Sequence, residues 1–132
     1  MVSSPSRAYV AFQGGGALGM AHLGAWQVLA HRFQIAGTAG TSAGSIVAAL
    51  CAAGYIPAQA KRVFFDLDWS RYVKPMTLNN WVDLVVKRQG WSDGELFYQK
   101  MKELLAENFI KPAQRITFET LYQETGIYLA IM

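Results

Sequence analysis

A chain of 132 residues is long enough for one domain. Its residues are 52% hydrophobic and only 16% charged, and this composition indicates that much of the chain is buried. This composition argues against intrinsic disorder, and a formal charge of +3 is too small to indicate nucleic-acid binding. Because the first acidic residue is Asp66, we expect the first half to be largely buried sheet and helix.

The first half of the chain predicts two strand-helix units, each with a glycine-rich turn between its strand and its helix. The apolar run 8–12 is typical of a strand covered on both faces, and it leads through a turn at 13–19 into a helix over about 20–32. A second strand begins at Ile35, turns at Ser42 and continues as an alanine-rich helix that Gly54 ends. This βαβα order favours an α/β fold with a mainly parallel sheet, in which both turns open at the carboxyl edge.

The second half predicts three more helices and a final strand. Pro57 can begin a helix that reaches about Phe65. A capping box with Ser92 as N-cap opens another that runs to about Asn108, and Thr117 caps a short helix over 118–124 that Gly126 ends. The run 127–132 is interpreted as a buried strand. Because the sequence stops directly after it, we expect the chain to be a fragment of a longer one.

Cys51 is the single cysteine, so an internal disulfide is excluded. It fits a reducing compartment, or simply a small buried thiol in an alanine-rich helix, and packing is the preferred interpretation. The first residues lack the pattern of a secretory signal, and the uncharged tract 33–60 is too interrupted by polar residues and Pro57 to span a membrane. We therefore expect a cytoplasmic protein.

The pattern Gly40-x-Ser42-x-Gly44 joins the second strand to its helix. A serine on such a sharp turn projects its hydroxyl away from the sheet, and glycines suit the crowded backbone on either side. The N-terminus of the helix then lies beneath the hydroxyl, where its dipole favours an anion. Ser42 is therefore the candidate nucleophile, with Gly40 and Gly44 forming the elbow.

The first glycine-rich turn supplies what a serine nucleophile needs beside it. Attack on an ester carbonyl requires N–H donors aimed at the developing oxyanion, and consecutive glycines can turn several of them toward one point. The residue after the nucleophile can add its own N–H group. The candidate oxyanion hole consists of Gly14, Gly15, Gly16, Gly19 and Ala43.

Together these two motifs resemble the N-terminal part of a patatin-like phospholipase. The loop from Gly14 to Gly19 is similar to the family's Gly-Gly-Gly-x-x-Gly, and the residues 40–44 match its Gly-Thr-Ser-Ala-Gly elbow letter for letter. The similarity continues through 20–24, 52–55 and 90–94 and covers nearly the whole chain, so that 1–132 is interpreted as the N-terminal portion of one patatin-like domain. The resemblance implies a three-layer α/β/α fold and hydrolysis of lipid acyl esters by a serine–aspartate dyad, with no cofactor and no metal.

The chain departs from the family pattern at two places. Family members often carry Arg or Lys where this chain has Leu18, so the contribution of that charge is missing. The aspartate of the family's dyad lies in a downstream Asp-Gly-Gly or Asp-Gly-Ala motif, and this sequence contains neither. Asp93-Gly94 is better explained as part of the capping box. The dyad aspartate is therefore expected beyond residue 132, and the fragment alone is expected to be inactive.

Histidine does not supply a triad here, because His22 and His31 both precede Ser42, whereas an α/β-hydrolase has the order Ser, acid, His. A structural role is favoured for His22, which lies near the glycine loop. Gly14-x-Gly16-x-x-Gly19 also fits a dinucleotide-binding fingerprint, but that motif needs an acidic residue about 20 positions on, and none occurs before Asp66. A further alternative is a lipid-binding or regulatory module without turnover.

The stretch 69–91, which begins with Trp69 and ends with Trp91, mixes aromatic with basic residues. Trp and Tyr suit the headgroup layer of a membrane and Lys and Arg suit anionic lipid, so peripheral membrane contact is one hypothesis. The alternative is a helical cover over the active-site edge of the sheet. The predicted partner is thus a lipid ester substrate, and peripheral membrane contact through Trp69 to Trp91 stays a hypothesis beside the cover alternative.

Overall fold

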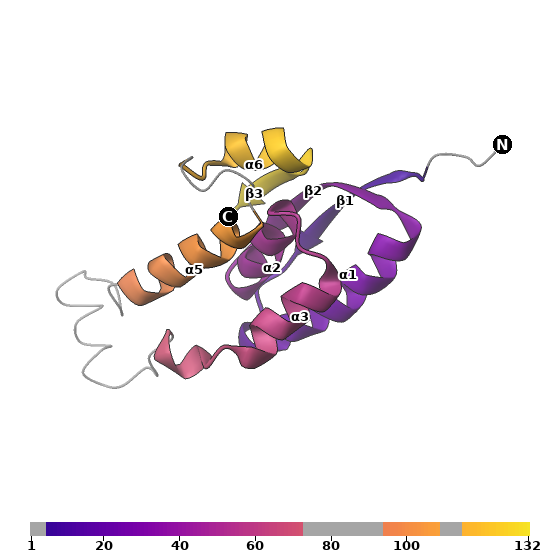
Figure 1. The fold of residues 1–132 in the computed structure, drawn as a ribbon. Helices are drawn as coiled ribbons and strands as arrows, with labels where there is room; N and C mark the ends of the chain where they lie inside the picture. Colours follow the sequence, from indigo (N-terminus) through magenta and orange to yellow (C-terminus); the bar gives the residue numbers. More distant parts are fainter. Residues whose placement is uncertain (1–4, 73–93, 109–114) are drawn as a thin grey trace.

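The computed structural model describes residues 5–72, 94–108 and 115–132 (Figure 1). The strands are β1 (Arg7–Phe12), β2 (Gln34–Gly40) and β3 (Tyr128–Ile131), and the α-helices are α1 (Ala21–Arg32), α2 (Ala43–Ala52), α3 (Pro57–Asp66), α5 (Glu95–Glu107) and α6 (Phe118–Thr125). Two short 3-10 helices cover Gly16–Met20 and Trp69–Arg71. In the described part of the chain, no helix combines the length and the hydropathy needed to cross a membrane.

The three strands form one parallel sheet in the order β1-β2-β3. Phe12 pairs with Gly40, and Gly40 pairs with Ile131, so the carboxyl ends of all three strands meet at one edge. The N–H of Thr41 extends the pairing by donating to the carbonyl of Phe12 at 3.2 Å. Both glycine-rich turns therefore open at the same edge, as predicted, and the α/β class with a parallel sheet is confirmed.

Helix α2 is the centre of the core and lies against β2. Its side chains from Val47 to Ala52 are buried, and five of its ten residues are alanine or glycine at positions where a larger side chain would hold it away from the sheet. The buried hydroxyl of Thr38 on β2 donates to the carbonyl of Ala48 at 3.0 Å. This close packing fixes where the N-terminus of α2 lies.

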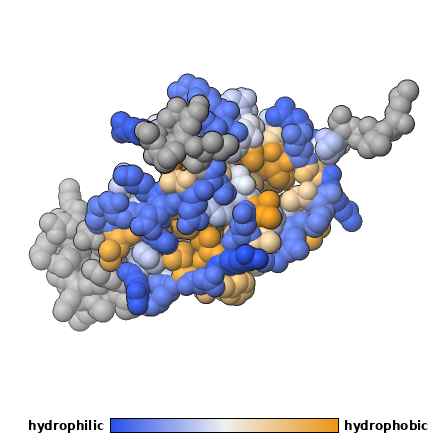
Figure 2. All heavy atoms as spheres, in the orientation of Figure 1, coloured by the Kyte–Doolittle hydropathy of each residue, from blue (hydrophilic) through white to orange (hydrophobic). Residues whose placement is uncertain are grey.

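The helices α1 and α3 pack beside α2, and their buried residues Leu23, Trp26, Ala60 and Phe64 join one cluster with Phe12 of β1. On the opposite face of the sheet, Tyr9 and Tyr128 are exposed, and Tyr128 stacks on Tyr122 of α6 with ring centroids 4.1 Å apart. The third layer of the expected architecture is thus not among the residues that the structure describes. Figure 2 shows hydrophobic residues gathered in the hollows between hydrophilic helix surfaces.

Most predicted ends of the second half agree with the structure. Pro57 is the first residue of α3, the Thr117 hydroxyl accepts from the N–H of Thr120 at 3.1 Å, and Gly126 follows α6 with a φ of 71°. The predicted start of α5 is wrong, because α5 begins at Glu95 with Gly94 as its N-cap at a φ of 69°. Ser92, which we had expected to cap this helix, lies outside the described residues.

The prediction of a buried strand over 127–132 is correct in position but wrong in burial. The strand covers Tyr128–Ile131, and only Leu129 among its residues is not exposed. The physical reason is that β3 is an edge strand in the described sheet, with a partner on one side in β2. The apolar pattern of a segment in the sequence predicts a strand, but it does not indicate whether another strand or helix covers that strand.

The thiol of Cys51 on α2 is 2% exposed, and burial raises its pKa to about 12 from the usual 9.0. Since only the thiolate reacts, this difference of about 3 pH units lowers the reactive fraction roughly 1,000-fold near pH 8. We predict that a disulfide reagent such as Ellman's reagent modifies the native protein at least about 100-fold more slowly than the urea-unfolded protein. Equal rates in the two states would show that Cys51 is accessible.

Candidate active site

Ser42 stands at the turn between β2 and α2 with a φ of 52° and a ψ of −127°. In the described part of the chain it is the one non-glycine residue with a positive φ. A conformation of this kind costs about 1–3 kcal/mol and persists only where the surroundings impose it. The side chain is exposed and forms no capping hydrogen bond, although Ser42 occupies the N-cap position of α2. Its hydroxyl is therefore held clear of the sheet, as the elbow pattern predicted.

The glycines on either side of Ser42 are required by close backbone contacts. A Cβ atom on Gly44 would lie 2.2 Å from the carbonyl oxygen of Phe12, and one on Gly40 would lie 2.4 Å from the carbonyl oxygen of Gly44. Real Cβ atoms do not approach backbone atoms so closely, and backbone cannot swing aside as a flexible side chain can. Gly40 and Gly44 thus allow β1, β2 and the start of α2 to meet at one point.

Ser45 holds the elbow from the helix side. Its hydroxyl donates to the carbonyl of Ser42 at 2.5 Å, and its backbone N–H donates to the same oxygen at 2.9 Å. Ser45 thus lines the start of α2. With its hydroxyl engaged in this way, Ser45 supports the conformation of Ser42 and does not compete with it as a nucleophile.

The first glycine loop lies directly beside Ser42. A Cβ on Gly14 would be 3.2 Å from the Cβ of Ser42 and 3.9 Å from its Oγ, and one on Gly19 would be 2.9 Å from the Cβ of Ala43. The backbone N–H groups of Gly14 and Gly15 form no hydrogen bond with any described residue. Ala43 is the first residue of α2, where a helix leaves its N–H without an intrahelical partner. The structure therefore brings the predicted loop and elbow together.

His22 connects the glycine loop to α1. Its Nε2 donates to the carbonyl of Gln13, 2.9 Å away, and its ring meets Phe12 edge to face at 5.5 Å. A backbone carbonyl can only accept, so Nε2 carries the hydrogen. These contacts agree with the structural role predicted for His22, which fixes the residue that precedes Gly14.

A cavity of about 710 Å³ opens at Ser42, a volume in the range of small-molecule sites. Its walls come from the glycine loop, the start of α2, the end of α3 with the residues after it, and the start of α5. The described residues that line it include no Asp, Glu, Lys, Arg or His. They are Gly16, Ala17, Met20, Ser42, Ala43, Ser45, Ile46, Phe64, Trp69, Ser70, Tyr72, Gly94 and Phe97.

Three residues of this wall, Trp69, Ser70 and Tyr72, come from the stretch that begins at Trp69. The indole N–H of Trp69 donates to the carbonyl of Phe64 at 2.8 Å, and the two rings lie 5.0 Å apart between centroids. Tyr72 meets Trp69 edge to face at 6.4 Å. The described beginning of the stretch thus packs over the active-site edge, as the cover hypothesis predicted, while residues 73–91 lie outside the described part.

No carboxylate of the described residues lines the Ser42 cavity. Asp68 is near its rim, but its Oδ1 accepts from the N–H and hydroxyl of Ser70 and its Oδ2 lies 3.3 Å from Nε of Arg71. The bond with Ser70 is the main cause that lowers the pKa of Asp68. Asp93 lies outside the described residues. Within the described ranges, no group of three His, Cys, Asp or Glu side chains could hold a metal.

Residues 10–124 match the patatin-like phospholipase family. The chain belongs to this family. The resemblance predicted from the glycine loop and the elbow is therefore confirmed, and the dinucleotide-binding alternative is no longer needed for the glycine loop.

Two proteins are similar to this chain, one in sequence and one in fold. An uncharacterized protein, YqhO of Bacillus subtilis, is 31% identical over 107 residues, which are 76% of this chain and 36% of YqhO. The crystal structure of the type III effector protein ExoU superposes with a TM-score of 0.60 at 21% identity over 98% of this chain and 33% of ExoU. At this identity the likeness to ExoU shows the fold. The chain spans about a third of the length of each of these two proteins.

Sequence reasoning missed the aromatic wall of the cavity. Phe64, Trp69 and Phe97 come from separate segments of the sequence, and no spacing between them indicates that they meet. The single available signal was that Phe97, Met101, Leu104 and Leu105 share one face of α5.

Two glycine-to-alanine substitutions test the elbow geometry against a matched control. We predict that Gly44→Ala unfolds the protein or lowers its unfolding free energy by more than about 3 kcal/mol, because the added methyl collides with backbone. Gly24→Ala in α1 has open space around the added methyl, and it is expected to stabilise the protein by about 0.5–1 kcal/mol. Urea denaturation measures both. A Gly44→Ala protein as stable as the parent would contradict the geometry.

Proposed function

We propose that the protein of which this chain forms part is a lipid acyl hydrolase, a phospholipase or esterase with Ser42 as its nucleophile. One observation carries the proposal: the exposed hydroxyl of a strained Ser42 lies beside Gly14 of the glycine loop, at the N-terminus of α2, in a cavity whose described lining residues carry no charge. Membership in the patatin-like phospholipase family supports the same reaction.

In the proposed reaction, Oγ of Ser42 forms a bond to the ester carbonyl carbon as its proton passes to a base. The carbonyl oxygen becomes an oxyanion that accepts hydrogen bonds from the N–H groups of Ala43 and the loop Gly14 to Gly16, with Gly19 keeping the loop close to Ala43. The C–O bond to the alcohol then breaks, and the alcohol leaves with the proton. Water hydrolyses the acyl-enzyme by the same steps in reverse, which frees the fatty acid.

The base of this reaction is proposed to be an aspartate in a part of the protein outside this chain. The described cavity lining contains no Asp, Glu or His, and the sequence lacks the Asp-Gly-Gly or Asp-Gly-Ala motif of the family's dyad. The chain spans about a third of the length of its two similar proteins, which leaves room for such a residue in a longer protein.

The cavity favours the acyl part of a lipid over its headgroup. Its described lining is apolar except for the hydroxyls of three serines and Tyr72 and for backbone groups, so a phosphate would find no cationic side chain there. We propose that the acyl chain enters this cavity while the headgroup stays outside it. Peripheral membrane contact by the stretch 69–91 would present the lipid at this edge, and it remains a proposal.

The second candidate is a lipid-binding module without turnover. The lack of an acid or base in the described cavity lining favours it for this chain alone, since an apolar cavity binds a lipid without chemistry. Labelling of Ser42 and ester hydrolysis separate the two candidates.

Fluorophosphonate labelling provides the direct test of Ser42. We predict that the probe labels the longer protein at Ser42 and this chain far more slowly, because the base lies outside this chain, that Ser42→Ala abolishes labelling, and that Ser6→Ala, a serine outside the cavity, leaves it unchanged. The longer protein should hydrolyse fatty acyl esters, with kcat reduced at least about 1,000-fold by Ser42→Ala. Absence of labelling in both would reject the hydrolase and favour the binding module.

A further inference from the structure

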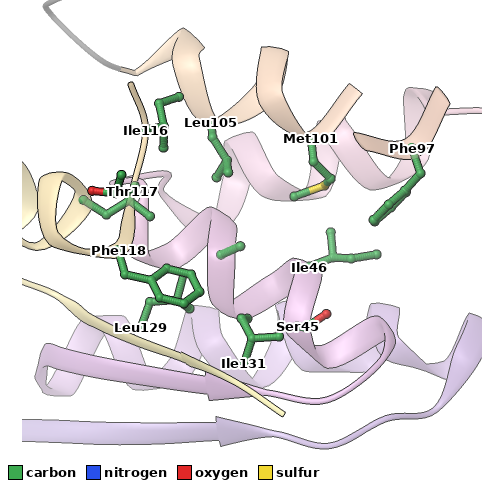
Figure 3. Close-up of a pocket in the computed structure, with 12 residues that line it drawn as sticks. Ser45, Ile46, Phe97, Met101, Leu105, Ile116, Thr117, Phe118, Leu129 and Ile131 are labelled. Atoms are coloured by element: carbon green, nitrogen blue, oxygen red, sulfur yellow. The ribbon is translucent and has the colours of Figure 1, made fainter. Parts of the chain in front are cut away.

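A second apolar cavity lies next to the one that opens at Ser42. Its volume is about 430 Å³, and it lies between α2, α5, α6 and β3 with an opening to solvent (Figure 3). None of its described lining residues carries a charge, and the proposed reaction does not use it. Its lining residues are Ser45, Ile46, Ala49, Phe97, Met101, Leu105, Ile116, Thr117, Phe118, Leu121, Leu129 and Ile131.

Three residues line both cavities: Ser45, Ile46 and Phe97. Ser45 is held at the elbow by its bonds to Ser42, which leaves Ile46 and Phe97 as the two large side chains between the cavities. Figure 3 shows Phe97 extending from α5 toward Ile46 on α2, with Met101 beside it on the side of the second cavity. Ile46 and Phe97 therefore form the wall that separates the two spaces.

The helix that carries Phe97 is fixed against the core. Leu104 is 3% exposed, and the hydroxyl of Tyr55 lies 2.6 Å from the carbonyl oxygen of Leu104 and 2.9 Å from Oε2 of Glu107. The amide of Asn108 donates to the carbonyl of Ala53 at 3.4 Å. Because Phe97, Met101 and Leu105 follow at intervals of four residues, they lie along one face of this anchored helix. The wall and the second cavity thus belong to the same rigid surface.

We propose that the second cavity is a subsite for the far end of a long acyl chain, and that Phe97 is the residue that limits the chain length accepted from the Ser42 cavity. The proposal deepens the proposed function and rests on it for the position of the ester at Ser42. An uncharged, flexible hydrocarbon is the chemistry that two adjoining apolar cavities accept without an unpaired polar group. Each methylene moved from water into such a space raises affinity about fourfold.

Binding of saturated fatty acids of 8 to 18 carbons tests the subsite without turnover. The protein is this chain with Ser42→Ala, and calorimetry at pH 8 below each acid's critical micelle concentration gives the affinities. With Phe97 in place, affinity should rise with length and then level off when the first cavity is filled. Phe97→Ala should shift this levelling to longer chains and raise the affinity for 16 carbons at least about 10-fold relative to 8 carbons.

Two further variants locate the effect in the second cavity. Adding Leu105→Trp to Phe97→Ala should fill that cavity and cancel the gain, whereas Tyr98→Ala, an aromatic residue of α5 that is 59% exposed and lines neither cavity, should leave the length profile unchanged. Circular dichroism and thermal melting establish that each variant folds. If Phe97→Ala does not fold, Ile46→Ala opens the same wall from α2 and is expected to give the same shift.

An unchanged length profile in the wall variants, a gain that survives Leu105→Trp, or no saturable binding of any fatty acid would each overturn the proposal. The result is independent of the nucleophile. A length shift in a protein whose Ser42 does not react with fluorophosphonate would keep the subsite and reject the hydrolase. Labelling of Ser42 without a length shift in the wall variants would keep the hydrolase and reject the subsite.

Discussion

The contact of α2 with the ends of β1 and β2 is the constraint on which the rest of the site depends. A hypothetical Cβ on Gly44 falls 2.2 Å from the carbonyl oxygen of Phe12, so at this position the chain tolerates hydrogen alone. The closeness forces the turn at Ser42 into its strained conformation and aims the N-terminus of α2 at the serine hydroxyl. The alanine-rich helix and the bond from Thr38 to Ala48 stabilise the same approach from behind. About 1–3 kcal/mol of backbone strain is offset in this way by packing elsewhere.

The elbow and the loop could be predicted because their geometry depends on the residue types within each short segment. Gly40, Gly44 and the run Gly14 to Gly16 are small where backbone must approach backbone, and the parallel order of strands places both turns at one edge. The same locality made the helix boundaries at Pro57, Thr117 and Gly126 predictable, since each depends on the residue's own backbone preference or on one short capping bond. Membership in the patatin-like phospholipase family followed from these residues alone.

Features that depend on distant contacts could not be predicted. The sequence predicts that Ser92 caps α5, whereas α5 begins at Glu95 with Gly94 as its N-cap. The exposure of β3 depends on which element lies beside it. The cavities are a stronger case, because Phe64, Trp69 and Phe97 come from three separate segments and meet only after α3 and α5 have packed. The sequence pattern indicates that Phe97 lies on an apolar helix face. The same pattern is expected whether that face packs against other side chains or contacts an acyl chain.

Among the described residues, those that line the Ser42 cavity carry no charge, and this has two consequences that reinforce each other. An apolar wall accepts hydrocarbon, and the same wall lowers the local dielectric, so that hydrogen bonds from N–H groups to an oxyanion are stronger than they would be in water. A cationic side chain there would stabilise the ground state of a carboxylate product as well as the transition state, and product would leave more slowly. The donors proposed for the oxyanion, the N–H groups of Gly14, Gly15 and Ala43, carry no net charge, and in the proposed reaction they are oriented before the substrate arrives. A site built in this way needs its acid and base at the mouth of the cavity, where ester and water meet, and leaves its interior free to discriminate among acyl chains.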